Sequence, residues 1–265
     1  MDRLKHRIVS LLPYAVGLLL GWLLLYPPEA LAPLGSWRYL VAALLVLLLL
    51  IAFTAAQLAA NLPDPITLTP LGEGDEVPPD LLELGARLEA LGFVPAGPPY
   101  DVGVRPPAVL LPFVHEAERA YSTVFRTRTL PAKTVFDFVS IFDSERGGLT
   151  SMAEPAGAAL PAAPGGLRQV FPGAGLEEVW RGHREGLGWL RGRGLPARAT
   201  DAARFVGDFR ASFARQRRAF LAAPLRTAVI TVWRAATGRT PEMGPLAEQR
   251  GAEAELQALL IGHRG

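Results

Sequence analysis

Residues 134–151 read TVFDFVSIFDSERGGLTS, and this stretch decides the fold of the larger part of the chain. Its first half places phenylalanines on one face of a strand and Asp137, among β-branched residues, on the other. Gly147 and Gly148 then follow a run of turn-forming residues, and glycine readily adopts the positive φ values of tight hairpins. The pattern predicts a β-hairpin in which Asp137 is an acid flanked by apolar side chains on its own face of the strand.

Two segments upstream show the same alternation. They are AVLLPFVHE at 108–116 and RAYSTVFRTR at 119–128, and the connections between the segments are short. Short connections favour an antiparallel meander, so we expect a strand-rich region over 93–152. Pro112 lacks the N–H that a central strand uses, which predicts an edge position for the first segment.

Helical periodicity flanks this region. Residues 79–92 predict a helix that starts at a proline and ends at Gly92. A helix-rich region follows over 175–261, with its clearest helix capped by Thr200 and a last helix at 245–261. The composition of 225–236 fits a strand or a helix. The proline- and glycine-rich stretch 153–166 predicts a flexible connection between the two regions.

The N-terminal part of the 265-residue chain is dominated by two apolar runs. Residues 8–26 and 39–60 contain no charged side chain, and each is long enough to cross a bilayer as a helix. They predict a transmembrane helical hairpin over 1–62, followed by an extramembrane domain at 63–265. A cleaved signal peptide is the competing interpretation, because a basic segment precedes the first run and Ala30-Leu31-Ala32 resembles a cleavage site.

The fold class expected from the sequence is therefore a membrane-anchored α+β protein, with an antiparallel sheet and helices in the extramembrane domain. Arg3, Lys5 and Arg7 precede the first run, whereas the loop between the runs contains only Arg38. This asymmetry predicts a multi-pass protein of the inner membrane with both termini in the cytoplasm. The chain has no cysteine, which excludes disulfides and thiolate chemistry.

Small residues recur at helical spacing in both apolar runs. Gly17 and Gly21 lie one turn apart in the first run, and Ala52, Ala56 and Ala60 repeat that spacing in the second. Small residues let helix backbones approach closely in lipid. They are candidates for packing against a membrane-protein partner, or for packing of the two runs on each other.

The net charge of +2 conceals an arginine-rich region between residues 181 and 239. Its basic-surface candidates are Arg204, Arg215, Arg217 and Arg218. Three interpretations compete: a solvated face, a contact with anionic lipid head groups, and a nucleic-acid surface. The third is disfavoured, because the sequence contains no recognised nucleic-acid module.

The sequence offers little catalytic chemistry. The four histidines are far apart and fit no metal-ligand spacing, and His183 is expected to be a surface residue. No phosphate-binding or dinucleotide-binding motif occurs. Ser140, His115 and Asp137 lie on neighbouring predicted strands, but nothing in their spacing favours a catalytic arrangement. No catalytic residue, cofactor or metal is assigned.

These observations favour a non-enzymatic accessory, scaffold or assembly subunit of a larger membrane protein complex. The lipid bilayer and a membrane-protein partner are the expected contacts. One alternative is a membrane-tethered enzyme with a site near His115 and Asp137, and another is a domain that binds an anionic lipid surface.

Overall fold

The computed structural model describes residues 37–61, 65–72, 74–103, 107–128, 132–142, 147–154, 161–237 and 242–261. The chain divides into two compact units, Met1–Gln57 and Leu58–Gly265. The helix of the first unit is α2 (Trp37–Asn61), which ends just past the boundary. All the described strands, and the other described helices, belong to the second unit.

The predicted membrane-spanning hairpin is wrong for the described part of the chain. No described helix combines the length and the apolar character needed to cross a membrane. The run 8–26 lies outside the described residues, whereas the run 39–60 lies within α2. The prediction rested on the length of the two runs and on their lack of charge, but crossing requires a single helix that is both long and apolar enough, and no described helix meets that requirement. The membrane-anchored fold class and the multi-pass location in the inner membrane are corrected by the same finding.

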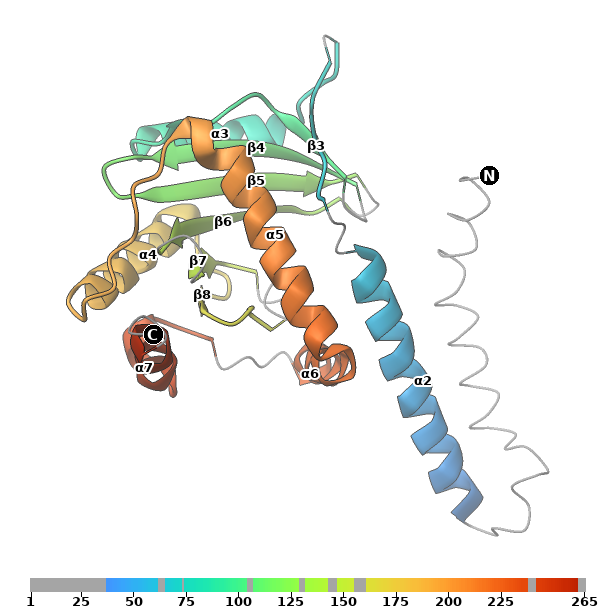
Figure 1. Cartoon of the computed structure of the whole chain (residues 1–265). Helices are drawn as coiled ribbons and strands as arrows, with labels where there is room; N and C mark the ends of the chain where they lie inside the picture. The colour runs from blue at the N-terminus through green and yellow to red at the C-terminus, as the bar shows by residue number, and fades with distance from the viewer. Residues whose placement is uncertain are drawn as a thin grey trace. The chain divides into compact units, whose positions relative to one another are not determined.

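The second unit is built on a mixed sheet (Figure 1). The strands follow the order β1-β3-β4-β5-β6-β7-β8, and the short β2 pairs with β4. All pairs are antiparallel except β7 with β8, which is parallel. The strands are β1 (Leu68–Pro70), β2 (Val94–Pro95), β3 (Tyr100–Val102), β4 (Ala108–His115), β5 (Ala120–Thr127), β6 (Thr134–Ile141), β7 (Gly148–Met152) and β8 (Gly166–Val170). The antiparallel sheet expected from the sequence is therefore wrong, because this last pair makes the sheet mixed.

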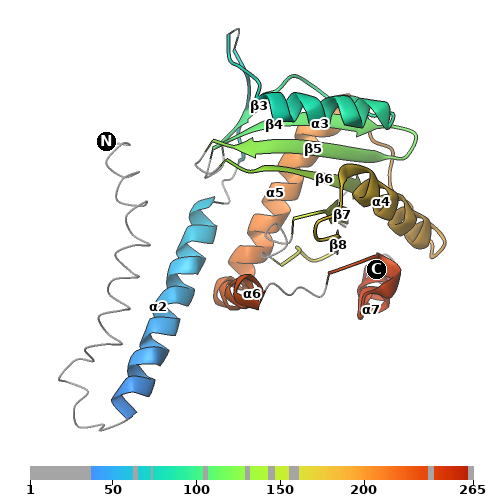
Figure 2. The same ribbon diagram turned by 180° about the vertical axis from the view of Figure 1, so that it is seen from behind.

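Helices cover both faces of the sheet, as the opposite views of Figures 1 and 2 show. On one face α3 (Pro79–Ala90) and α4 (Leu176–Arg191) pack around Phe93, Phe138 and Trp180. On the other face α5 (Phe205–Ala222) packs its phenylalanines against β3 to β6. The described part of the chain closes with α6 (Pro224–Thr237), a short 3-10 turn and α7 (Ala252–Ile261). The sheet is thus the middle layer of an α+β domain.

The three long predicted strands are confirmed as β4, β5 and β6, but the edge position of Pro112 is wrong. β4 is paired on both sides along most of its length. Its outer neighbour is split into β2 and β3, which pair with residues 113–114 and 108–110 and leave Pro112 between them. The Pro112 carbonyl accepts a hydrogen bond from Ala96 N–H at 2.9 Å. The missing donor therefore coincides with a break in the neighbouring strand.

The predicted hairpin is confirmed between β6 and β7, where Ile141 is opposite Gly148. Gly147 has a φ of 104°, whereas the φ of Gly148 is not positive. A Cβ atom on Gly147 would lie 2.0 Å from the carbonyl oxygen of Gly165. Gly147 therefore serves the turn and also lets the segment before β8 approach the hairpin closely.

The helical predictions are confirmed with changes at the boundaries. Residues 225–236, which were ambiguous, lie in α6. The single helix expected over 245–261 is interrupted at Gly251, which has a φ of 99°. Asp201, rather than Thr200, caps the turn before α5, because its carboxylate accepts the Arg204 N–H at 2.9 Å. Of the connection predicted at 153–166, residues 155–160 lie outside the described residues.

Candidate functional site

A cavity of about 120 Å³ lies between α5 and the sheet, and Asp137 is on its sheet side. β5 to β7 contribute Tyr121, Thr123, Asp137, Val139, Ile141 and Thr150. α5 contributes Phe205, Asp208, Phe209, Ser212 and Phe213. The cavity is therefore mainly apolar, with a carboxylate on each of its two walls.

Asp137 is held by the neighbouring strand. It is directly opposite Thr123 in the β5–β6 register, and the Thr123 hydroxyl donates a hydrogen bond to Asp137 Oδ1. Burial raises the pKa of Asp137 from 3.8 to about 6, and the Thr123 hydrogen bonds and the more distant Arg168 only partly oppose this effect. Ionised Asp137 is thus poorly solvated, and a cation that reached the cavity would stabilise it.

We expect Asp137→Asn to stabilise the protein near pH 8 by up to about 3 kcal/mol and to have little effect below pH 4. The folded-state pKa of about 6 exceeds the ordinary value of 3.8. The stabilising contribution of the neutral acid is therefore complete below pH 4 and is lost as the pH rises through 6. The asparagine side chain is neutral throughout and still accepts from Thr123. Urea titrations at pH 4 and pH 8 measure the difference.

The control for this substitution is Asp75→Asn, because Asp75 is exposed and its side chain accepts a hydrogen bond from Gly72 N–H that an amide oxygen can also accept. A gain from Asp137→Asn that is equal at both pH values would contradict the assigned pKa shift.

The structure separates the three residues considered as a catalytic arrangement. His115 lies on the face of α3 and α4, where its ring contacts Phe93 and Trp180 at centroid distances of 5.2 and 5.6 Å. Asp137 lines the cavity on the opposite face. Ser140 is buried on the α4 side, where it contacts His183. Alternation along β6 separates Ser140 from Asp137, so no site combines the three side chains.

A different polar cluster lies in the core between the sheet and α4. The Ser140 hydroxyl is 2.9 Å from His183 Nε2, and the Ser151 hydroxyl is 2.8 Å from His183 Nδ1. Gln169 Nε2 donates to Ser151 Oγ at 2.9 Å, and Gln169 Oε1 accepts the Leu246 N–H at 2.7 Å. This cluster joins β6, β7, β8, α4 and the chain before α7.

The surface position predicted for His183 is wrong. His183 is fully buried, as are Ser140, Ser151 and Gln169. Burial lowers the pKa of His183 to about 3, so the ring is neutral, with one nitrogen donating and the other accepting. Without solvent or substrate access, the serine–histidine contacts stabilise the core. Gly182 and Gly186 on the same helix face were the sequence signal for this close approach.

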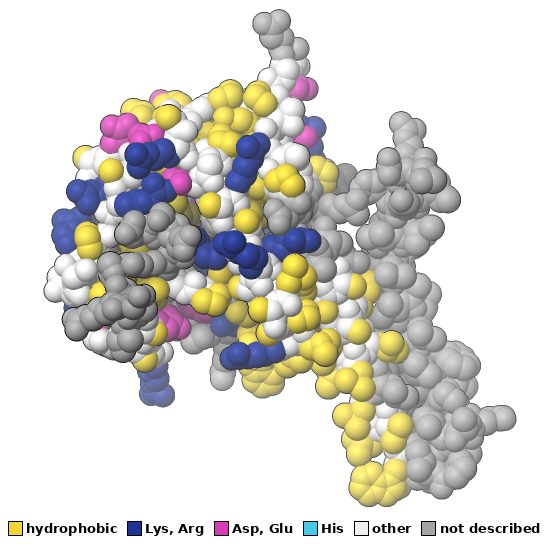
Figure 3. All heavy atoms as spheres, in the orientation of Figure 1, with side chains coloured by type: hydrophobic (Ala, Val, Ile, Leu, Met, Phe, Trp, Pro, Cys, Tyr) yellow, Lys and Arg dark blue, Asp and Glu magenta, His cyan; other side chains and the backbone are white. Residues whose placement is uncertain are grey.

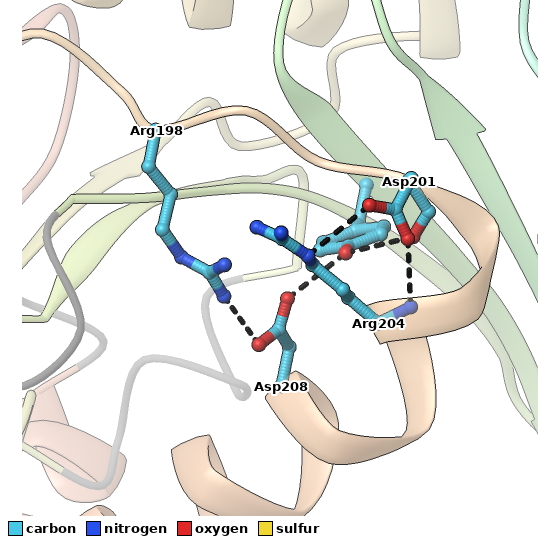
Figure 4. A network of polar contacts seen from close by, with 5 residues as sticks. Arg198, Asp201, Arg204 and Asp208 are labelled. Carbon is cyan, nitrogen blue, oxygen red and sulfur yellow. Dashed lines mark hydrogen bonds and ion pairs between the residues drawn. The ribbon is translucent and has the colours of Figure 1, made fainter.

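The second carboxylate of the cavity belongs to the network at the start of α5 (Figure 4). Arg198 donates to Asp208 Oδ1, and the Tyr121 hydroxyl lies 2.9 Å from Asp208 Oδ2 and 3.0 Å from the Asp201 carbonyl oxygen. Burial is the main cause that raises the pKa of Tyr121, and the neighbouring Asp208 carboxylate raises this pKa further. Asp208 is therefore already neutralised by an arginine, and Tyr121 remains a neutral hydrogen-bond donor.

The four basic-surface candidates occupy different environments. Arg204 pairs with Asp201 at 3.2 Å, and Arg218 is exposed. Arg215 and Arg217 are partly buried. Burial is the main cause that lowers the pKa of Arg215, and the positive charge of Arg218 lowers it further. Among the helix-packing candidates, Ala52 and Ala56 are exposed on α2, Gly17 and Gly21 lie outside the described residues, and the side chain of Ala60 is not described.

Large exposed apolar side chains at the end of α5 and along α6 form the set that we call the apolar ridge. Its members are Leu221, Leu225, Val229 and Trp233, which are 49%, 61%, 46% and 66% exposed. They recur every four residues, and within α6 this spacing places three of them along one side of the helix. Large exposed apolar side chains that share one side of a helix differ from the scattered apolar residues of an ordinary surface.

Arginines border this apolar ridge. Arg218 precedes Leu221 by three residues, and Arg226 precedes Val229 by three, so each exposed arginine lies beside the ridge. Together α5 and α6 contain six arginines and a single acid, Asp208. Figure 3 shows Lys and Arg side chains among hydrophobic ones over the lower half of α5. Helical periodicity predicted α5, but the ambiguous composition of 225–236 concealed the ridge.

A larger groove, of about 650 Å³, lies between α6, α7 and residues 161–167. Its charged lining residues are two arginines and two glutamates, and Arg234 pairs with Glu242 at 3.0 Å. The charges of the described lining residues therefore balance. No group of three or more histidine, aspartate or glutamate residues that could hold a metal ion occurs among the described residues.

Comparisons of the chain with protein-family models, with curated proteins and with solved structures find no match. Function must therefore be inferred from the cavity, the buried cluster and the apolar ridge themselves.

Proposed function

We propose that this protein is a non-enzymatic accessory or assembly subunit, which docks an acidic amphipathic helix of a partner protein on the apolar ridge of α5 and α6. The observation that supports the proposal most is the exposure of three large apolar side chains along one side of α6 and of a fourth at the end of α5, with exposed arginines beside them. Aromatic residues and arginine are the side chains most enriched at protein interfaces. An amphipathic helix presents apolar residues at the same spacing as the ridge.

The charge of this surface selects the partner. Arg218 and Arg226, the two exposed arginines beside the ridge, favour acidic residues along the edges of the docked helix. A second copy of the chain would bring the same basic border against itself, which is unfavourable. The ridge therefore fits a different, acidic chain better than a homodimer.

The experiment is purification of the full chain from its native source under mild conditions, followed by native mass determination and identification of the partner. The expected result is a stoichiometric complex with one protein that contains an acidic amphipathic helix. A synthetic peptide of that helix should bind the isolated full chain in calorimetry. A monomer, a homodimer, or association with anionic vesicles in place of a protein would overturn the proposal.

Matched variants test the surface itself. We expect Leu225→Ser combined with Trp233→Ser to weaken peptide binding about 30-fold or more, because a central tryptophan commonly contributes 2 kcal/mol or more at an interface. Leu82→Ser is the control, since Leu82 is 55% exposed on α3, far from α6 in the sequence. Equal losses for the ridge variant and the control would contradict docking on the ridge.

A charge-reversal pair examines the border. Arg218→Glu with Arg226→Glu should weaken binding about tenfold at low salt and should reduce the salt dependence. Arg191→Glu, at the exposed end of α4, is the control with the same change of charge. If the double substitution left peptide binding unchanged, the arginines beside the ridge would not take part in docking.

A further inference from the structure

The cavity between α5 and the sheet has an aromatic wall. Tyr121 and Phe205 have ring centroids 5.5 Å apart, Phe205 and Phe209 are 5.6 Å apart, and Phe209 and Phe213 are 4.9 Å apart. These four rings form a continuous row, and all four line the cavity. The faces of aromatic rings carry negative partial charge and attract cations within about 6 Å of the ring centroid.

The sheet side of the same cavity supplies a counter-ion. Asp137 lines it, and its hydrogen-bond partner among the described residues is Thr123. Asp208 lines the other wall, but its carboxylate is engaged by Arg198 and Tyr121. None of the described residues that line the cavity is basic, and Arg168, which acts on Asp137 electrostatically, is not among them, so the described lining favours a positive charge.

We propose that this cavity binds the alkylammonium group of a small free molecule, with Asp137 as its counter-ion and the rings of Phe205, Phe209 and Phe213 around its alkyl groups. The volume of about 120 Å³ suits a group of several non-hydrogen atoms. Typical pockets for drug-sized ligands measure 300–1,000 Å³, so a nucleotide or an oligosaccharide would not fit. This binding site is distinct from the docking surface and goes beyond the proposed assembly role.

Other ligand classes fit the cavity less well. A hard metal ion such as Ca²⁺ takes six to eight oxygen ligands, and the described residues contain no cluster of three metal-binding side chains. An anion would meet two carboxylates, and a purely apolar ligand would leave ionised Asp137 without solvation. An alkylammonium group fits both features, because its alkyl groups pack on the apolar wall and its positive charge pairs with the Asp137 carboxylate.

Choline and its neutral isostere 3,3-dimethylbutan-1-ol are the probes that separate charge from shape. Binding to the full chain is measured by calorimetry and by ligand-observed NMR at pH 8, where Asp137 is ionised. The expected result is that choline binds at least ten times more tightly than the isostere. Equal affinities, or the absence of binding by both probes up to 100 mM, would overturn the proposal.

Variants then identify the residues responsible. Asp137→Asn should weaken choline binding at least tenfold and should leave binding of the isostere unchanged. Phe209→Leu, which keeps the wall apolar but removes one ring, should weaken choline binding about three- to tenfold. Asp75→Asn is the control for an exposed acid, and thermal melts establish that each variant folds. Choline binding that survives Asp137→Asn in the folded protein would exclude Asp137 as the counter-ion.

Discussion

Replacing His183 with leucine is expected to lower the free energy of unfolding by about 2–5 kcal/mol at pH 7. Leucine has a similar size, but it removes both hydrogen bonds of the ring and leaves the Ser140 and Ser151 hydroxyls without their histidine partner in the core. Each buried hydroxyl that loses its partner contributes about 1–3 kcal/mol to the loss. Urea unfolding measured by circular dichroism gives the difference directly.

His115→Leu is the matched control. His115 is only partly buried, and its ring nitrogen accepts one long hydrogen bond, from Glu118 N–H at 3.4 Å. We expect a loss below about 1 kcal/mol from this substitution, because leucine retains the apolar contacts with Phe93 and Trp180. If His115→Leu lowered the free energy of unfolding as much as His183→Leu does, the loss could not be attributed to the hydrogen bonds of the buried cluster.

The same histidine predicts how acid destabilises the protein. The folded-state pKa of His183, about 3, lies below its ordinary value of 6.5. The unfolded chain therefore binds a proton between pH 6.5 and pH 3 that the folded protein does not, and stability falls with the pH across this window. The contribution approaches about 1.4 kcal/mol per pH unit. The His183→Leu variant lacks this pH-dependent loss. The difference in the free energy of unfolding between the parent protein and the variant should therefore become smaller as the pH falls from 7 to 4. Parallel curves would contradict this explanation.

Substituting two neighbouring glycines of α4 by alanine is expected to change stability in opposite directions. A Cβ atom on Gly186 would lie 2.8 Å from Gln169 Nε2 and 3.0 Å from Leu149 Cδ2. Gln169 cannot move aside easily, because its amide binds Ser151, Gly182 and Leu246. We expect Gly186→Ala to lower the free energy of unfolding by about 1–3 kcal/mol.

Gly188→Ala is the control on the same helix. A Cβ atom on Gly188 would meet nothing within 4 Å, and its φ is not positive. Alanine should stabilise the protein there by about 0.5–1 kcal/mol through its higher helix propensity. Thermal or urea unfolding of both variants provides the measurement. Stabilisation by both substitutions would mean that α4 does not approach the sheet as closely as the Gly186 contacts require.

The candidate sites were only partly visible in the sequence. Asp137 was identified as an unusual acid because it lies among β-branched residues on one face of its strand. The structure places Phe205 in the core, and Phe209 and Phe213 pack against that core. The cavity between them depends on the way α5 crosses the sheet, and no local pattern predicts an unfilled volume.

The sequence by itself determined the local elements of the second unit. Strand alternation over 108–141, the hairpin glycines and the 3.6-residue periodicity of α3 and α5 all depend on residues a few positions apart, and the structure confirms these elements. The apolar run at 39–60 also predicted the helix α2, but not its environment, because absence of charge does not establish a membrane span.

Only the tertiary structure decided which side chains meet. Ser140 and His183 are 43 residues apart, and Ser151 and Gln169 are 18 residues apart, yet they form one buried cluster. The parallel pairing of β7 with β8 and the helical state of 225–236 were settled in the same way. The physical reason is that periodicity specifies which face of an element is apolar, whereas the choice of the opposing face depends on burial summed over the whole domain.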